Sequence, residues 1–395
     1  AQRDAPWLHP RDVSEQATGR IIDSLRAARD GTADTGFLAR IAARLTDDEW
    51  ASFATTGWKR RKALATALNR QLASDDLYTG APQACGSDFI GPAERRSLDA
   101  LAEASPARRV WWHRWLLHAE LRDHVRTPGH GLFNALERVL TLWVVSDDPA
   151  DVDLAHRLMQ HIDRLCVPEP QMHLHAGMQA GALALAYDTL HPHLEPEERV
   201  LWRRVCDRYL AAHLRTARVR SWTTTAIPNA NAITNGGGGL LALALLQEHP
   251  DARESLHLAR TYIRNFIDYC LGSDGGNTEG AQYWAYGTES LVRFGVALEQ
   301  TLGTDDGLLS DPAIVNLSNM IRVGLSNDGG MHGVNDTIPT PVGAELAWFA
   351  AHRFDDPLGM WYGDHALRVA RARRAAERHA PYAPEGLWAA VYRPD

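Results

Sequence analysis

Three asparagines, Asn229, Asn231 and Asn235, lie directly before a run of four glycines, residues 236–239. An asparagine at a helix start is often an N-cap, and capping explains any one of the three as well as a functional role does. Three together exceed what capping needs. Each glycine also costs a helix about 1 kcal/mol relative to alanine, which is tolerable where another helix or a ligand approaches the backbone closely. The segment is therefore a candidate binding site.

A second polar cluster follows about fifty residues later. Glu279, Tyr283, Trp284 and Tyr286 come after the turn residues 274–277, at the start of a predicted helix. Tyr283 and Tyr286 are three residues apart, so both can face the same side. Packing on a neighbouring helix would also explain the three aromatic residues, and the helix dipole would explain Glu279.

A third segment, residues 327–336, is polar and rich in glycine. As an ordinary helix connection it needs no function. If it borders the same cleft as the first two segments, its His332 and Asp336 can reach a ligand there.

The residue types of these segments suit one kind of chemistry. Amides can hold a carboxylate, while a phenol or an imidazole can move a proton at the adjacent carbon. The chain has no phosphate loop, no HExxH zinc motif and no serine nucleophile elbow, so we expect no metal and no cofactor.

Two other strings have the appearance of metal motifs. Residues 147–151 match a DDxxD magnesium motif, but Pro149 lies inside it and the string opens a helix, so helix capping is the better interpretation. His173 and His175 alternate along a predicted helix and make a poor metal pair.

Helical periodicity dominates the whole sequence, and strand alternation is almost absent. The predicted helices cover approximately residues 11–29, 36–75 with a break near Thr46, 93–122, 131–146, 150–165, 172–190, 196–217, 231–247, 252–271, 283–303, 312–325, 342–353 and 359–379. An all-α chain of 395 residues is too long for one four-helix core, so we expect hairpins arranged as a solenoid or an α/α toroid. The 13 tryptophans favour the toroid, whose clefts use aromatic rings to stack on sugars, although most will belong to the core.

The composition is that of an ordinary globular protein, with 45% hydrophobic and 23% charged residues. No apolar run is long enough to span a membrane. The net charge of −8 argues against a general nucleic-acid surface. Lys59 and Lys62 are the only lysines, and the many arginines suit two-point binding of carboxylate or sulfate, although a GC-rich coding sequence is the simpler explanation.

The four cysteines are widely spaced and predict buried thiols instead of a disulfide framework: Cys85, Cys166, Cys206 and Cys270. The chain begins at Ala1, which fits a removed signal peptide or an edited sequence. A secreted or periplasmic location is the expectation, and a cytoplasmic location stays open.

In an all-helical chain, these segments together resemble the heparinase II/III-like polysaccharide lyases, from about residue 125 onward. Residues 180–190 with 194–199 are similar to the family's LAYDWL…LSEEER, residues 229–236 to NWNAVCNG, residues 274–287 to DGGYxEGxxYWxYG, and residues 333–336 to its glycine-aspartate loop. The first 100 residues match only through His9-Pro10-Arg11.

The resemblance implies an α/α toroid followed by a C-terminal β-sandwich, with the substrate cleft between them. We expect an N-terminal helical region over residues 1–92 that packs on a toroid over residues 93–395. The chain ends about where the sandwich begins in the family. The sandwich, with a histidine that it contributes, is thus missing from residues 1–395 and is expected as a partner domain.

The activity that the resemblance implies is β-elimination in a uronic-acid polysaccharide. The enzyme removes the C5 proton, which requires donors that neutralise the adjacent carboxylate. Asn229 is the first choice for this role, with Asn231 as its neighbour or replacement and Arg220 as a supporting cation. Tyr283 is the first choice as acid or base, and Tyr286 competes with it.

The remaining candidate residues have supporting roles. His332 serves as the base if its loop faces the cleft, and Glu279 orients other side chains. Asn235, Trp284 and Asp336 complete the predicted substrate-binding set.

Two other functions stay open. One is an α/α-barrel glycoside hydrolase, with two carboxylates such as Glu279 and Asp336 on either side of a sugar. The other is a toroid that binds carbohydrate without cleaving it. In each case the partner is an acidic glycan; heparan sulfate, alginate and other uronates all fit.

Overall fold

The computed structural model describes residues 15–31, 42–72, 128–168, 172, 174–225, 228–326, 330–332 and 341–376. Every regular element in these ranges is a helix, so the described part of the protein is all-α. Isolated antiparallel bridges join Leu271 to Asn277 and Leu325 to Met331. Among these helices, none combines the length and the apolar character that a membrane crossing requires.

Contacts within the chain divide it into two units. The first comprises residues 1–82 together with 302–308, and the second comprises residues 83–301 together with 309–395. The boundary predicted between residues 92 and 93 lies outside the described residues, so it stays a prediction.

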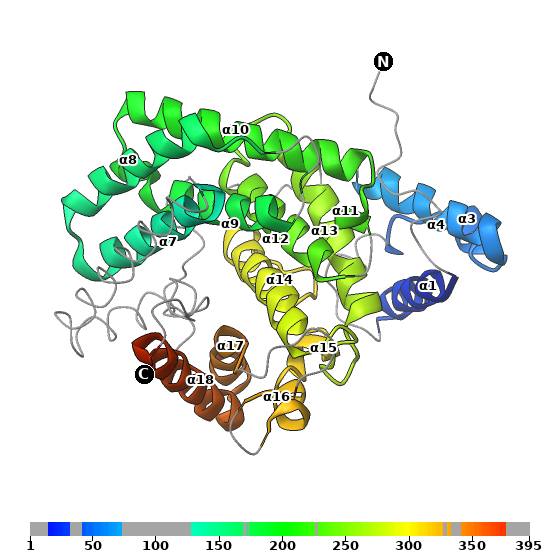
Figure 1. Ribbon diagram of the computed structural model, residues 1–395. Coiled ribbons are helices and arrows are strands. Elements are labelled where there is room, and N and C mark those ends of the chain that lie inside the picture. The colour runs from blue at the N-terminus through cyan, green and yellow to red at the C-terminus, as the bar shows by residue number, and fades with distance from the viewer. Residues whose placement is uncertain are drawn as a thin grey trace. The chain divides into compact units, whose positions relative to one another are not determined.

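In the first unit, α4 (Gly57–Leu72) packs against α1 (Glu15–Arg29) and α3 (Asp47–Ser52) (Figure 1). The break predicted near Thr46 is confirmed, because Thr46 caps α3. Its hydroxyl accepts a hydrogen bond from the N–H of Glu49, and the Glu49 carboxylate accepts one from the N–H of Thr46. This reciprocal pairing satisfies two N–H groups that a helix start would otherwise leave free.

The second unit contains the helices that position the candidate site (Figure 1). They are α7 (Pro128–Ser146), α8 (Pro149–Leu165), α9 (Leu174–Leu190), the 3-10 helix η2 (His191–His193), α10 (Pro196–Arg218), α11 (Trp222–Thr225), α12 (Asn229–Ala244), α13 (Ala252–Cys270), α14 (Ala281–Leu302), α15 (Pro312–Val315), α16 (Ser318–Gly324), α17 (Ala344–Phe354) and α18 (Pro357–Ala376). α12 lies between α9 and α13, and α10 packs against α8, α9, α12 and α13. Sequentially adjacent helices also pair, as α7 does with α8 and α17 with α18.

Every residue of α12 is buried. The glycine run 236–239 lies in the middle of this helix and within the predicted helical range 231–247. A Cβ on Gly237 would fall 1.8 Å from the carbonyl oxygen of Gly177 in α9, and one on Gly238 would fall 2.2 Å from the His213 ring in α10. Neighbouring helices therefore approach the backbone at these glycines.

The DDxxD string caps a helix, as the sequence predicted. Asp148 is the N-cap of α8, and its carboxylate accepts a hydrogen bond from the N–H of Ala150 at 3.0 Å. Pro149 occupies the first helical position, where its missing N–H is not needed.

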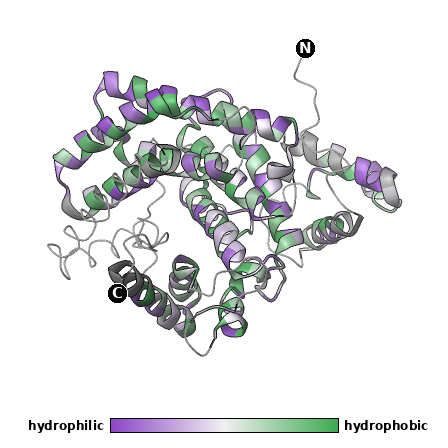
Figure 2. Cartoon of the chain, viewed as in Figure 1, coloured by the Kyte–Doolittle hydropathy of each residue, from purple (hydrophilic) through white to green (hydrophobic). Residues whose placement is uncertain are grey.

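α10 has one buried face and one polar face. Pro196 opens the helix, and Glu195 and Glu198 form a capping box around it. Trp202 and Tyr209 are buried on the inner face. Figure 2 shows hydrophilic residues recurring along α10 between hydrophobic ones, which is the pattern of a helix at a surface.

One predicted helix is interrupted. Residues 312–325 form two short helices, α15 and α16, instead of one. Between them the Asn316 side chain donates a hydrogen bond to the carbonyl of Ser273 at 2.9 Å, which ties this position to the loop after α13. The short helix α11 was not predicted, and the predicted helix 93–122 lies outside the described residues.

The prediction of buried thiols is confirmed for three cysteines. Cys166, Cys206 and Cys270 are buried and form no disulfide. Cys85 lies outside the described residues.

Candidate functional site

Asn229 and Glu279 lie next to each other, although they are 50 residues apart in the chain. Asn229 is the first residue of α12, and Glu279 lies in the loop between α13 and α14. One oxygen of the Glu279 carboxylate accepts a hydrogen bond from the backbone N–H of Asn229 at 2.8 Å, and the other accepts one from its side-chain amide at 3.1 Å. The first two polar segments of the sequence thus meet in one place, the Asn229–Glu279 junction.

Glycines shape the loop that carries Glu279. Gly275 and Gly280 have positive φ angles of 84° and 96°, which only glycine adopts readily. A Cβ on Gly275 would lie 2.0 Å from the carbonyl oxygen of Asn316. Within the loop, the Asn277 side-chain oxygen accepts a hydrogen bond from the N–H of Glu279 at 2.5 Å. Together these contacts fix the position from which Glu279 reaches Asn229.

Cys270 also contacts the junction. Its sulfur lies 3.4 Å from a Glu279 carboxylate oxygen. Burial, and then the nearby Glu279, raises the pKa of Cys270 to about 12, so the thiol keeps its proton at neutral pH and donates it to this hydrogen bond. With donors on both oxygens, Glu279 holds the Asn229 amide in place.

Asn229 retains a polar atom without a partner. The residue is 5% exposed, and its side-chain oxygen has no hydrogen-bond partner among the described residues. Leaving such an atom buried and unpaired costs about 1–3 kcal/mol, so it needs an explanation. The amide also has a second N–H beside the one that binds Glu279, and this N–H can donate to a carboxylate.

Tyr283 and Tyr286 lie on the first two turns of α14, and both are partly buried. A Cβ on Gly287 would lie 3.2 Å from the Cα of Asn229, so this part of α14 packs against the start of α12. The Tyr286 hydroxyl lies 3.4 Å from the sulfur of Met178 in α9.

Burial, followed by the charge of Glu289, raises the pKa of Tyr286. The Tyr286 phenol therefore keeps its proton at neutral pH. It can donate that proton but is not poised to act as a phenolate base.

A cavity of about 70 Å³ lies between α7, α9, α12 and α14. On the α14 side it is lined by Tyr286 and, further along the same helix, by Glu289 and Arg293. On the α12 side it is lined by Ile233 and Gly237, which follow the first residue of the helix at intervals of four. The cavity has the volume of about two water molecules, so it does not accommodate a sugar ring.

Glu289 is a buried carboxyl group in this cavity, and it was not among the predicted site residues. It is 7% exposed. The neighbouring Arg293 already binds Glu345 of α17 through two hydrogen bonds of 2.5 and 2.6 Å. Burial, and then the Glu345 charge, raises the pKa of Glu289 to about 8, whereas Arg293 acts in the opposite direction. Glu289 is therefore mainly protonated at neutral pH, which is unusual for a carboxyl group and typical of functional cavities.

Asn231 and Asn235 lie elsewhere on α12 and are fully buried. The Asn235 amide donates to the Asn231 side-chain oxygen at 2.6 Å, and the Asn235 oxygen lies 3.2 Å from Nε2 of His213. Nδ1 of His213 lies 2.7 Å from the Ser255 hydroxyl. Burial lowers the pKa of His213 to about 4, so the ring is neutral at neutral pH. These four residues form the Asn235–His213 cluster, in which neither asparagine exposes its side chain.

Of the remaining predicted residues, three lie in the described part of the chain and one does not. Trp284 is fully buried, and Arg220 lies in the turn after α10 with a φ of 53°. His332 is exposed, and no hydrogen bond or ion pair between described residues joins it to Asn229. Asp336 lies outside the described residues. Their roles stay predictions.

Comparison with known proteins assigns the chain to no family: no family model matches it, and a search of the curated proteins gives no match. Within the described residues, no three histidine, cysteine, aspartate or glutamate side chains are grouped so that they could hold a metal ion. The interpretation of the junction therefore depends on its geometry and on the short motifs in the sequence.

Proposed function

We propose that this chain is a polysaccharide lyase that cleaves uronic-acid-containing glycans by β-elimination and leaves unsaturated uronate ends. The observation that carries this proposal is the Asn229–Glu279 junction, which fixes an amide beside the tyrosine-bearing start of α14. A fixed amide and a phenol supply two functions that the reaction needs, which are stabilisation of a carboxylate and delivery of a proton.

In the proposed reaction, a base removes the C5 proton of the uronate. The electrons of the C5–H bond form the C4–C5 double bond, the bond from C4 to the glycosidic oxygen breaks, and that oxygen takes up a proton. The Asn229 amide donates a hydrogen bond to the uronate carboxylate and stabilises the charge that spreads onto it. Tyr283 donates the proton to the leaving oxygen.

Two further residues take part in the proposed proton transfers. His332 is the proposed base, since a neutral imidazole can accept a proton at neutral pH. Tyr286 competes with Tyr283 as the proton donor, and its raised pKa supports a donor role. Arg220 is the proposed supporting cation.

For the fold we propose an incomplete α/α toroid. The pairing of α7 with α8, of α12 with its neighbours α9 and α13, and of α17 with α18 supports an arrangement of helical hairpins. By the family resemblance, a C-terminal β-sandwich is the proposed partner domain and an acidic polysaccharide the proposed substrate. We propose a secreted or periplasmic location because such polymers are extracellular.

The geometry favours the lyase over the hydrolase alternative. A hydrolase needs two available carboxyl groups, whereas both oxygens of Glu279 already accept hydrogen bonds from Asn229. Glu289 carries a proton, but its cavity is too small for a sugar ring.

The test is incubation of the protein, with any segment that follows residue 395, with a panel of uronic-acid polymers. A lyase produces the ultraviolet absorbance of an unsaturated uronate, and a hydrolase produces new reducing ends without it. We expect Tyr283→Phe and Asn229→Ala each to lower the rate by about 10²–10⁴-fold, the range for loss of a positioned proton donor or an oxyanion-type donor.

Tyr362→Phe is the matched control, because the Tyr362 hydroxyl binds the backbone of Val342 and plays no part in the proposed reaction. It should retain the wild-type rate per folded molecule. Full activity in both Tyr283→Phe and Asn229→Ala would show that the site is elsewhere. Glycan binding without any product would identify a binding protein.

A further inference from the structure

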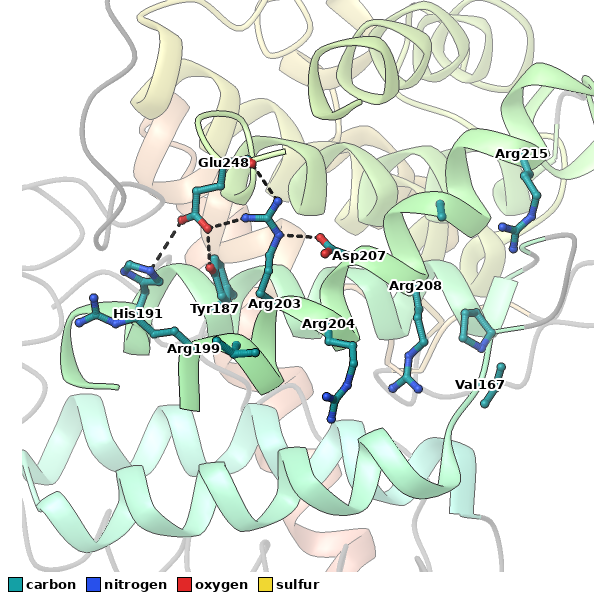
Figure 3. A pocket seen from close by; sticks show the side chains of 13 residues that line it. Val167, Tyr187, His191, Arg199, Arg203, Arg204, Asp207, Arg208, Arg215 and Glu248 are labelled. Atoms are coloured by element: carbon teal, nitrogen blue, oxygen red, sulfur yellow. Dashed lines mark hydrogen bonds and ion pairs between the residues drawn. The ribbon is translucent and has the colours of Figure 1, made fainter. Parts of the chain in front are cut away.

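A groove of about 780 Å³ runs along α10 and is separate from the candidate site (Figure 3). It is lined by Val167, Pro168, Tyr187, His191, Arg199, Val200, Arg203, Arg204, Asp207, Arg208, Ala211, Arg215 and Glu248. None of these is a residue of the Asn229–Glu279 junction or of the α12–α14 cavity. The volume is within the range of sites that bind ligands of a few rings.

Five arginines of α10 line this groove: Arg199, Arg203, Arg204, Arg208 and Arg215. From the first to the last they cover about 24 Å along the helix, at 1.5 Å per residue. Figure 3 shows that Arg203 points toward Glu248, whereas Arg204 and Arg208 point to the opposite side. The guanidinium groups are thus distributed along the groove and do not meet at one point.

Three carboxylates partly compensate these five charges. Arg204 and Arg208 share Asp163, at 2.6 and 2.9 Å. Arg203 binds Asp207 at 2.6 Å and Glu248 at 2.7 Å. Among the described residues that line the groove, the carboxylates are Asp207 and Glu248, so arginines outnumber them there although the net charge of the chain is −8.

The carboxylates that pair with these arginines already bind side chains of the protein. Glu248 accepts a hydrogen bond from the Tyr187 hydroxyl at 2.8 Å in addition to its pair with Arg203. Hydrogen bonding to Arg204 lowers the pKa of Asp163, so this group stays ionised. Among the described residues, Arg199 binds through its Nε, which donates to the carbonyl of Leu194 at 2.9 Å. The terminal nitrogens of Arg199 and the 56% exposed side chain of Arg204 are consequently open to an additional anion.

We propose that this groove binds a segment of an acidic polysaccharide through its carboxylate groups. Guanidinium groups bind carboxylates in two-point contacts, as Arg204 already does with both oxygens of Asp163. Val167 and Val200 also line the groove; they are 72% and 66% exposed and offer aliphatic surface to the C–H faces of sugar rings.

The lining favours a polysaccharide over a single-stranded nucleic acid. Single-stranded nucleic acids stack their bases on exposed aromatic rings, but the tyrosine of the groove, Tyr187, is 1% exposed. The proposal does not depend on the lyase reaction, since no residue of the groove takes part in catalysis.

The test measures binding of a galacturonate hexasaccharide by calorimetry at low salt, using Tyr283→Phe protein so that no cleavage occurs. We expect the double substitution Arg199→Gln and Arg204→Gln to weaken binding about tenfold or more, because two charge-assisted contacts are lost. Added salt should weaken binding to the parent protein and have a smaller effect on the double variant.

Arg218→Gln is the matched control. Arg218 lies at the end of the same helix, has a 51% exposed side chain and pairs with Glu254 outside the groove. Its substitution should change the affinity by less than about twofold. If Arg199 and Arg204 formed only ordinary helix-surface ion pairs, the double substitution would have an equally small effect on the affinity. A neutral glucan hexasaccharide should not bind.

Two results would overturn the proposal. One is unchanged affinity in the double variant, with its fold verified by circular dichroism. The other is equal or tighter binding of polydeoxythymidine or polyglutamate to the groove. Failure to detect unsaturated products would reject the lyase assignment and leave this binding result standing.

Discussion

The same helix, α12, presents asparagines to two different surroundings. Asn231 and Asn235 belong to the Asn235–His213 cluster, where the asparagine and histidine side chains bind one another. Asn229 binds Glu279 at the junction, yet its side-chain oxygen has no partner among the described residues. Residues of one type thus stabilise the fold where their groups are satisfied and become available for binding where one group is left over.

The comparison also separates two kinds of effect. Substitutions in the cluster should lower the free energy of unfolding and leave the proposed chemistry of a folded molecule intact. Substitutions at the junction should lower the rate of the proposed reaction and have little effect on the free energy of unfolding.

Gly237→Ala should have the largest effect on stability, a loss of at least about 3 kcal/mol in the free energy of unfolding. Its Cβ would lie 1.8 Å from the backbone oxygen of Gly177, so α9 and α12 must separate. Gly181→Ala, at the same helix contact, is the control, because its Cβ would lie 3.7 Å from Gly237 in ordinary contact. Urea unfolding of both variants measures the difference, and equal stabilities would contradict the helix packing described.

Asn235→Ala should lower the free energy of unfolding by about 2–3 kcal/mol. Without its amide, the Asn231 side-chain oxygen and Nε2 of His213 lose a partner inside the core. The rate of any glycan cleavage per folded molecule should stay unchanged. A stable Asn235→Ala protein without activity would instead indicate that Asn235 belongs to the active site.

The α12–α14 cavity and the Asn235–His213 cluster should respond in opposite directions to pH. The pKa of Glu289 is raised from 4.5 to about 8, so the unfolded chain loses this proton first and stability falls as pH rises through this window. The pKa of His213 is lowered from 6.5 to about 4, so its contribution to stability is lost as pH falls through that range.

Glu289→Gln should flatten the decline on the alkaline side and leave the decline on the acidic side in place. Thermal denaturation at a series of pH values tests both halves of this expectation. If the alkaline decline persists in the variant, Glu289 does not carry the proton assigned to it.

Asn229→Ala should have the smallest effect on stability, a change of about 1 kcal/mol or less. The backbone N–H of Asn229 still binds Glu279, and the unpaired oxygen is removed together with the amide. Urea unfolding measures this change. A loss as large as that of Asn235→Ala would mean that Asn229 is a structural residue like its neighbours, and the contrast would disappear.

Much of the fold could be predicted from the sequence, because its signals are local. The proline and aspartate at the start of α8 and the capping box of α3 placed those helix starts to within a residue or two. The predicted single helix 312–325 was wrong because its interruption depends on a long-range contact, the hydrogen bond from Asn316 to Ser273.

The candidate site could be predicted only in part. The sequence pointed to Asn229 and Glu279, but it did not separate Asn229 from Asn235, since their difference lies in contacts with α10 and with the loop after α13. Glu289 was missed because a glutamate four residues before an arginine usually forms an exposed ion pair. Here Arg293 binds Glu345, 52 residues away, and no local pattern indicates that contact.

The glycine run also determines how α12 forms during folding. Four glycines and three asparagines give this segment little tendency to be helical by itself, so its helix forms only as α9, α10 and α13 assemble around it. No partly folded state should retain α12 without them. Its amide hydrogens are therefore expected to exchange with solvent only through global unfolding, and the Asn235–His213 cluster and the Asn229–Glu279 junction, which share this helix, should be lost in a single cooperative step.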